Sequence, residues 1–459
     1  MYDRKRVWAQ DREILRLAGP CIMENLSSTM VGFVDAAMIG ALGAEATAAV
    51  GVVAPFTWLI GGVVSSIGVG GTAVVARLIG GKNDGEARRV TGQVFWMAAA
   101  LSALMTLLVV ACAPLIPAVM QADGALHRDC AAYLRCLALG YIPCYTGMVM
   151  GALLRGAGDT RTPMVSGLLA NAVNVVLNFF MIYEPRFIAI GGGSLYVWGA
   201  GLGVEGAALA SALANAFSGV YILLHMRRKK TRLRLEIPPL KRVQGSVWAR
   251  VLRIGTPAAL ERVAVNLGQM LFASMISSLG VAEIAAHSLA IEIEGLGYMP
   301  AYGFGAAATT LVGMRLGEGD REGARYVGKR AATLAVLLLI AVGAGTFVFA
   351  PQLIALFTPD ERVRAIGASL ICICSFEQPF NALNNVLSGA LRGAGDTRMP
   401  LMYSFVSMWL VRILLSWLLG ICLGGGIYVI WWCMVADLGV RGALMAWRFH
   451  QGKWADIRV

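Results

Sequence analysis

The sequence predicts an all-α integral membrane protein with twelve transmembrane helices in two parallel six-helix bundles. Its composition, the distribution of its basic residues and an internal repeat support this fold class. The 459 residues are 58% hydrophobic and 14% charged, with a mean hydropathy of +0.68. Soluble globular proteins carry about 25% charged residues, so this composition disfavours a soluble enzyme, a coiled coil or a disordered chain.

The predicted helices are stretches with few charges that are long enough to cross a membrane, which takes about 20 residues. The twelve spans are 14–40, 46–76, 91–118, 130–155, 162–183, 199–225, 251–279, 283–314, 331–358, 364–391, 399–421 and 427–447. The second to ninth each contain a stretch without Asp, Glu, Lys or Arg. The first, tenth and eleventh are interrupted by one or two charges, and glycines 424–426 separate the last two. The spans leave no room for a soluble domain, and a β-barrel would instead alternate over about ten residues.

The net charge of +12 could indicate a nucleic-acid binder, but the basic residues are distributed as in a membrane protein. With the N-terminus in the cytoplasm, 32 of the 39 Lys and Arg residues fall in cytoplasmic segments and five fall in outer loops. This pattern predicts an inner (plasma) membrane protein with both termini in the cytoplasm and no nucleic-acid partner. The nine cysteines form no CxxC pair, so we expect no disulfide framework, metal site or other cofactor.

Four sequence matches recur at an offset of about 237 residues, and the longest, RGAGDTR-x-P, occupies 155–163 and 392–400. The repeat predicts an N-terminal bundle at 1–225, a basic cytoplasmic linker at 226–250 and a C-terminal bundle at 251–459. Six spans in each half place both halves the same way up, as in one class of secondary transporters. In each repeated turn, we expect glycine to end one helix and Asp or Thr to cap the next.

Polar residues of the N-terminal bundle are candidates for function because an ionisable group in the membrane is costly. Glu24 and Asp35 are eleven residues apart and therefore nearly on one face of the first helix. Asn171, Asn174 and Asn178 follow at helical spacing in the fifth helix. We expect these residues to form a polar pocket in which Asp35 gains and loses a proton. The alternative is that the asparagines only hold helices together.

The C-terminal bundle has its own acids and amides, in the predicted seventh, eighth and tenth helices. They are Glu261, Glu292, Glu294, Glu377 and Asn381, and we expect them to line a substrate cleft or a second coupling site. Arg262 is expected to pair with Glu261 or with a carboxylate of the eighth helix. Glu24 and Glu261 occupy equivalent positions in the two halves, each four residues after a proline, which favours a scaffold role for both.

The chain resembles the multidrug and toxic compound extrusion (MATE) family of antiporters over nearly its whole length. The segments that carry the resemblance are 17–24, 34–40, both repeated turns, 285–288 and 299–300. The resemblance implies a V-shaped pair of six-helix lobes. It also implies export of bulky, cationic and amphipathic compounds, driven by inward movement of H⁺ or Na⁺.

The resemblance further implies roles for individual residues. Asp35 matches the functional aspartate of the family's first helix, and Asn174 matches an asparagine of its ion site. Asn178 stands where some prokaryotic members have an aspartate, and this departure leaves H⁺ and Na⁺ coupling open. Glu261 is similar to a glutamate of the seventh helix, and Glu377 is a loose substitute for an aspartate of the tenth.

The predicted function is therefore secondary active antiport of a small-molecule substrate by a monomer in the lipid bilayer. A lipid-linked oligosaccharide flippase of the same superfamily is the alternative. It would need cationic residues along its cleft, and only Arg262 and Arg412 are basic within the spans. A membrane-embedded enzyme is disfavoured because the spans contain no histidine cluster, metal spacing or Ser-His pairing.

Overall fold

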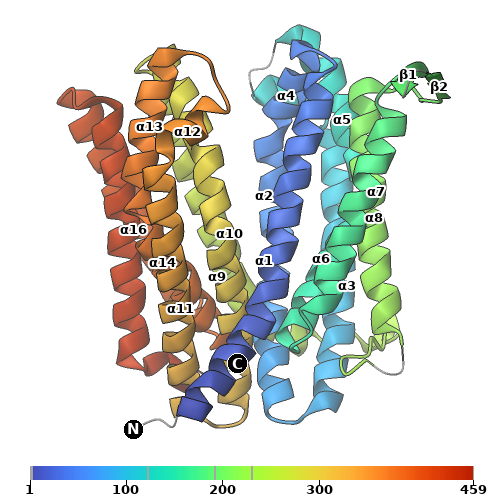
Figure 1. The fold of residues 1–459 in the computed structure, drawn as a ribbon. Coiled ribbons are helices and arrows are strands. Elements are labelled where there is room, and N and C mark those ends of the chain that lie inside the picture. Colours follow the sequence, from blue (N-terminus) through green and yellow to red (C-terminus); the bar gives the residue numbers. More distant parts are fainter. Residues whose placement is uncertain (1–3, 121–122, 191–192, 229–230, 458–459) are drawn as a thin grey trace.

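The computed structural model describes residues 4–120, 123–190, 193–228 and 231–457, which are helical apart from loops and one short hairpin. Two helical bundles stand side by side (Figure 1). The first, the N-lobe, comprises α1 to α8, and the second, the C-lobe, comprises α9 to α16. Both termini lie at the same end of the molecule, here called the termini end, which the sequence predicts to be cytoplasmic (Figure 1).

The N-lobe helices follow the predicted spans. They are α1 (Arg4–Gly40), α2 (Ala44–Gly80), α3 (Asp84–Cys112), α4 (Ile116–Val119), α5 (His127–Ala138), α6 (Tyr141–Gly156), α7 (Arg161–Met181) and α8 (Gly203–Met226), with a 3-10 turn, η1 (Gly124–Leu126). Helices α5 and α6 meet at an angle of 55° and together make the fourth span. The loop before α8 forms an antiparallel hairpin, β1 (Arg186–Ile190) and β2 (Gly193–Val197), which was not predicted because five-residue strands show little periodicity.

The C-lobe repeats this order. Its helices are α9 (Gly245–Ser277), α10 (Val281–Gly317), α11 (Arg321–Val348), α12 (Ala350–Ala355), α13 (Glu361–Ser375), α14 (Gln378–Gly393), α15 (Arg398–Val406) and α16 (Gly426–Gln451). The eleventh span continues from α15 through two π-helical segments, η3 (Ser407–Leu414) and η4 (Ser416–Cys422). Short 3-10 turns lie at η2 (Leu240–Arg242) and η5 (Lys453–Asp456).

Among the described residues, seven helices are long and apolar enough to cross a membrane, or eight with the bent α5–α6 pair. The four remaining predicted spans correspond to α1, α9, α10 and the α13–α14 pair. These are the spans that carry the predicted acids and amides, so polar residues lower their hydropathy. Within a twelve-helix membrane protein, such helices need polar partners inside the bundle.

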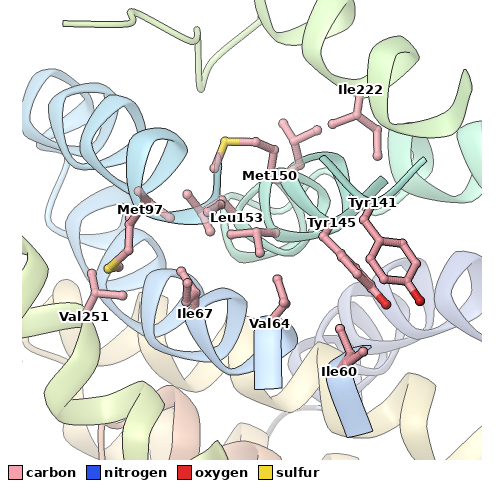
Figure 2. Packing of buried hydrophobic residues seen from close by; sticks show 14 of the residues in the cluster. Ile60, Val64, Ile67, Met97, Tyr141, Tyr145, Met150, Leu153, Ile222 and Val251 are labelled. Atoms are coloured by element: carbon pink, nitrogen blue, oxygen red, sulfur yellow. The ribbon is translucent and has the colours of Figure 1, made fainter. Parts of the chain in front are cut away.

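Each lobe core includes the beginning of a helix from the other lobe. The N-lobe core on α2, α3, α5 and α6 includes Val251 and Ile254 of α9; Figure 2 shows Val251 with Ile67 and Met97. The C-lobe core on α10, α11, α14 and α16 includes residues 14, 17 and 18 of α1. Both exchanged helices contain an internal proline, Pro20 or Pro257, which marks where each helix leaves the other lobe's core.

The lobes pack tightly at the termini end. Gly80 of α2 lies so close to α10 that a Cβ atom there would be 1.9 Å from the Met314 carbonyl oxygen. Thr310 Oγ1 of α10 donates across the interface to the Arg155 carbonyl oxygen over 2.9 Å. At the opposite end the ribbons of the two lobes diverge (Figure 1). The molecule is therefore closed at the termini end and spread at the other.

The repeated turns have the local structure that the sequence predicts. Gly158 and Gly395 adopt φ of 87° and 88°, a backbone conformation that favours glycine. Asp159 Oδ1 accepts a hydrogen bond from the Thr162 backbone N–H over 3.0 Å at the start of α7. The capping expectation is thus confirmed, and it explains why each turn begins the next helix.

Candidate functional site

The acidic residue of the N-lobe, Asp35, lies in a polar cluster between α1, α7 and α8. Asn178 Nδ2 donates to Asp35 Oδ1 over 2.6 Å. Asn174, one turn away on the same face of α7, contacts Ser211 of α8. Asn178 and Asn174 are only 1% and 6% exposed. The structure therefore brings together Asp35 and two of the three asparagines predicted to surround it.

The Asn174 amide lies between Asp35 and Ser211, and each of its orientations suits one charge state of the aspartate. With its nitrogen toward an ionised Asp35, the amide donates to Oδ1 over 2.7 Å and accepts from Ser211 Oγ over 3.2 Å. With its oxygen toward the carboxyl group, the amide donates to Ser211 and can accept a proton from a neutral Asp35. The cluster thus satisfies Asp35 in both states by turning one amide group.

Glu24 and Asn171 lie nearer the termini end and do not join this cluster. Asn171 Nδ2 donates to Ser27 Oγ over 2.9 Å, which ties α7 to α1. Glu24 instead forms an ion pair with Arg155 of α6, with 3.3 Å between nitrogen and oxygen. Of the predicted polar stripe, the outer part surrounds Asp35 and the inner part connects helices.

The same ion pair recurs in the C-lobe at an offset of 237 residues. Glu261 of α9 pairs with Arg392 of α14 over 2.8 Å and accepts a hydrogen bond from Ser404 Oγ over 2.9 Å. Arg155 and Arg392 are the first residues of the two repeated turns, so each turn anchors a glutamate of its own lobe. The expected partner of Glu261, the adjacent Arg262, was therefore wrong, because consecutive helix residues point in different directions.

An open cavity of about 570 Å³ lies on the C-lobe and faces the N-lobe helix α2 through Trp58. Its charged lining residues are Glu261, Arg262, Glu294, Arg392, Arg412 and Arg441. The sequence analysis counted only two bases within the spans, and this count was wrong. Arg392 and Arg441 were assigned to cytoplasmic segments, yet their side chains turn inward to meet buried carboxylates.

The carboxylate that meets Arg441 is Asp437, which the sequence analysis did not single out. Asp437 is fully buried in α16 and lies 2.8 Å from both Arg412 Nε and Arg441 Nη2. Ser407 also donates to it. The spacing of Asp437 and Arg441, four residues apart in the last predicted span, is the signal that could have identified this ion pair.

The other acids of the C-lobe are divided between the interior and the surface. Glu294 and Glu377 are 5% and 0% exposed, and their carboxyl groups are within hydrogen-bonding reach of each other. Tyr298 OH donates to Glu377 Oε1 over 3.3 Å. Asn381 is also fully buried and contacts Asn385. Glu292, two residues before Glu294, is exposed and does not line the cavity.

Comparisons with known proteins agree on the family. The sequence model of the MatE family matches residues 20–180 and 257–418, two segments that begin 237 residues apart. The probable multidrug resistance protein NorM of Thermotoga maritima is 31% identical over 450 residues, which cover 98% of this chain and 94% of that protein. The multidrug resistance protein MdtK of Edwardsiella ictaluri is 27% identical and covers 91% of this chain and 89% of its own length.

Solved structures have the same fold. One, described as the outward-facing conformation of a multidrug resistance MATE family transporter, superimposes with a TM-score of 0.88 at 22% identity and covers 97% of each chain. A transporter from Pyrococcus furiosus, described as having a binding pocket of reverse polarity, also gives a TM-score of 0.88 at 22% identity. It covers 98% of this chain and 97% of its own.

Proposed function

The chain belongs to the MatE family of multidrug efflux transporters, and from that premise we propose that it exports bulky amphipathic compounds in exchange for H⁺ or Na⁺. The observation that carries this proposal is the Asp35 cluster. An aspartate among helices, held by neighbours that suit its charged and its neutral form, can bind and release a cation with little rearrangement. Such a group is what an ion-driven antiporter requires.

The architecture supports alternating access around this cluster. Helix α1 carries Asp35 in the N-lobe, while its first turns belong to the C-lobe core. Neutralising Asp35 changes how strongly the outer part of α1 is held against α7, and α1 connects that change to the other lobe. A bound ion shifts a two-state equilibrium only through such a difference between the states. We infer that Asp35 acts on the interface between the lobes through α1.

The substrate proposal is a cationic, amphipathic compound, with Asp35 and the C-lobe glutamates as its acidic counterparts. One observation favours the alternative substrate, the pyrophosphate of a lipid-linked oligosaccharide. Four arginines line the C-lobe cavity, and Arg262 has no ion-pair partner among the described residues. A guanidinium group binds phosphate in a bidentate manner, so this cavity wall suits an anionic group.

The remaining parts of the proposal concern the setting of the protein. We place the chain in the inner (plasma) membrane as a monomer, with the termini end in the cytoplasm and H⁺ or Na⁺ as the only ion that transport needs. The closed termini end then corresponds to an outward-facing state. No enzymatic reaction is proposed.

Purified protein in liposomes tests the proposal. Ethidium efflux is measured under a pH gradient and, separately, under a Na⁺ gradient. We expect Asp35→Asn to abolish efflux, and the matched exposed variant Asp129→Asn to leave it unchanged. The driving gradient identifies the ion. Full activity of Asp35→Asn would refute the role of Asp35, and movement of an anionic lipid-linked substrate but no dye would favour the flippase.

A further inference from the structure

Two buried glutamates of the C-lobe are more than the ion pairs around them can neutralise. Glu294 of α10 and Glu377, at the break between α13 and α14, have their carboxyl groups in contact. Arg412 of η3 is the nearest base, but it is already 2.8 Å from Asp437. Arg441 also pairs with Asp437. When all five groups are ionised, three carboxylates face two guanidinium groups, and the cluster carries one net negative charge.

Three oxygen atoms around this pair have no hydrogen-bond donor in the described part of the chain. They are Glu294 Oε2, Glu377 Oε2 and Gln378 Oε1, each on a side chain at most 5% exposed. Gln378 Oε1 points at α10, because it lies 3.0 Å from the position that a Cβ atom would take at Gly297, three residues after Glu294. Buried acceptors without donors are costly, so these atoms indicate a missing positive charge or proton.

Other titratable groups around the pair do not supply that charge. On α10, Tyr298 donates to Glu377, and His287 lies toward the outer end between Phe272 and Trp431. On α13, Cys374 is buried nearby. From α9, Arg262 lines the adjacent cavity. None of these groups compensates the second glutamate.

We propose that Glu294, Glu377 and Gln378 form a second cation site, which holds one H⁺ or one Na⁺ and is separate from the Asp35 cluster. One proton shared by two touching carboxyl groups, or one Na⁺ held by the three free oxygens, brings the cluster to neutrality. Glu294 also lines the C-lobe cavity, so occupation of this site sets the charge that a substrate meets there. Neither glutamate repeats in the N-lobe, where Thr57 and Gly140 occupy the equivalent positions.

The test measures the site without transport. Infrared difference spectroscopy of purified Asp35→Asn protein in detergent at neutral pH detects the C=O stretch of a protonated carboxyl group. We expect one such band without Na⁺. Glu294→Gln and Glu377→Gln should each remove it, since a single glutamate is balanced by Arg412 and Arg441 together with Asp437. The control Glu292→Gln, an exposed glutamate on the same helix, should keep it.

Sodium distinguishes the two occupants. A band that disappears with Na⁺ but not with choline identifies a site that exchanges H⁺ for Na⁺, and a band that ignores Na⁺ identifies a proton site. Both results support the proposal. The absence of a band with or without Na⁺, together with unchanged Na⁺ binding in Glu294→Gln and Glu377→Gln protein, overturns it. Either glutamine variant alone suffices if the other does not fold.

Discussion

The closed termini end depends on a glycine that leaves no space for a side chain. A Cβ atom at Gly80 would lie 1.9 Å from the Met314 carbonyl oxygen, far inside the 3.0 Å limit that real contacts keep. The neighbour is backbone, so it cannot rotate away. We therefore expect Gly80→Ala to destabilise the closed termini end, while a state in which the lobes separate there accommodates the methyl group.

The size of the effect follows from the cost of overpacking, about 1–3 kcal/mol. If the other state avoids this cost, the ratio of the two populations changes by about 5- to 150-fold. Spin labels at positions 45 and 281, both exposed at the outer ends of α2 and α10, report the change. In a background without the native cysteines, electron–electron resonance should show a shorter distance between labels in Gly80→Ala, because the outer ends approach when the termini end separates.

A matched control on the same helix is Gly51→Ala, since nothing lies within 4 Å of a Cβ atom there. It should keep the distance distribution of the parent protein. Gly317 provides a second variant, because its Cβ would be 2.0 Å from the Arg77 carbonyl oxygen. If Gly80→Ala and Gly317→Ala both fold and both give the parent distribution, the reasoning is refuted.

Three further predictions concern ion pairs and the Asp35 cluster. The bidentate hydrogen bonds from Arg330 hold the pKa of the Asp11 carboxyl, which precedes the first predicted span, below its ordinary value. The docking of the start of α1 should therefore weaken as pH falls through that lowered pKa, and hydrogen exchange of this segment should lose its pH dependence in Arg330→Gln. Arg392→Gln leaves a buried glutamate unpaired and should cost about 3–5 kcal/mol, whereas Arg155→Gln, at a half-exposed pair, should cost about 1 kcal/mol or less; equal losses of thermal stability would contradict this. Asn178→Leu removes a hydrogen bond to a charged group worth about 1.5–3 kcal/mol, so half-saturation of efflux by the driving ion should rise at least about tenfold, and an unchanged value would argue against the cluster as the ion site.

Much of the fold was predictable because it follows from local rules. A span needs about 20 apolar residues, and basic residues stay on one side of the membrane. The repeat at 237 residues predicted the duplicated architecture, and helical spacing predicted that Asn174 and Asn178 share a face that Asp35 can meet. The hairpin before α8 escaped prediction because its strands are short.

The C-lobe site was predictable only in part. Glu294 and Glu377 stood out as acids within spans, but nothing in their spacing shows that they touch, because they lie on helices that are distant in the chain. Glu292 stood out equally and proved to be exposed. Arg441 was counted as a cytoplasmic residue, although its side chain pairs with Asp437 inside the lobe. The identity of each partner depends on how the helices are rotated in the bundle.

The sequence by itself determined what each segment must do: cross the membrane, face the cytoplasm or repeat its counterpart in the other half. Those properties depend on the free energy of transferring residues between water and lipid, which is a sum over neighbouring residues. The tertiary structure decided which charges neutralise one another. It paired Glu24 and Glu261 with the arginines of the repeated turns and left Glu294 beside Glu377 without a base of their own. Charge compensation depends on distances between helices, and only packing sets those distances.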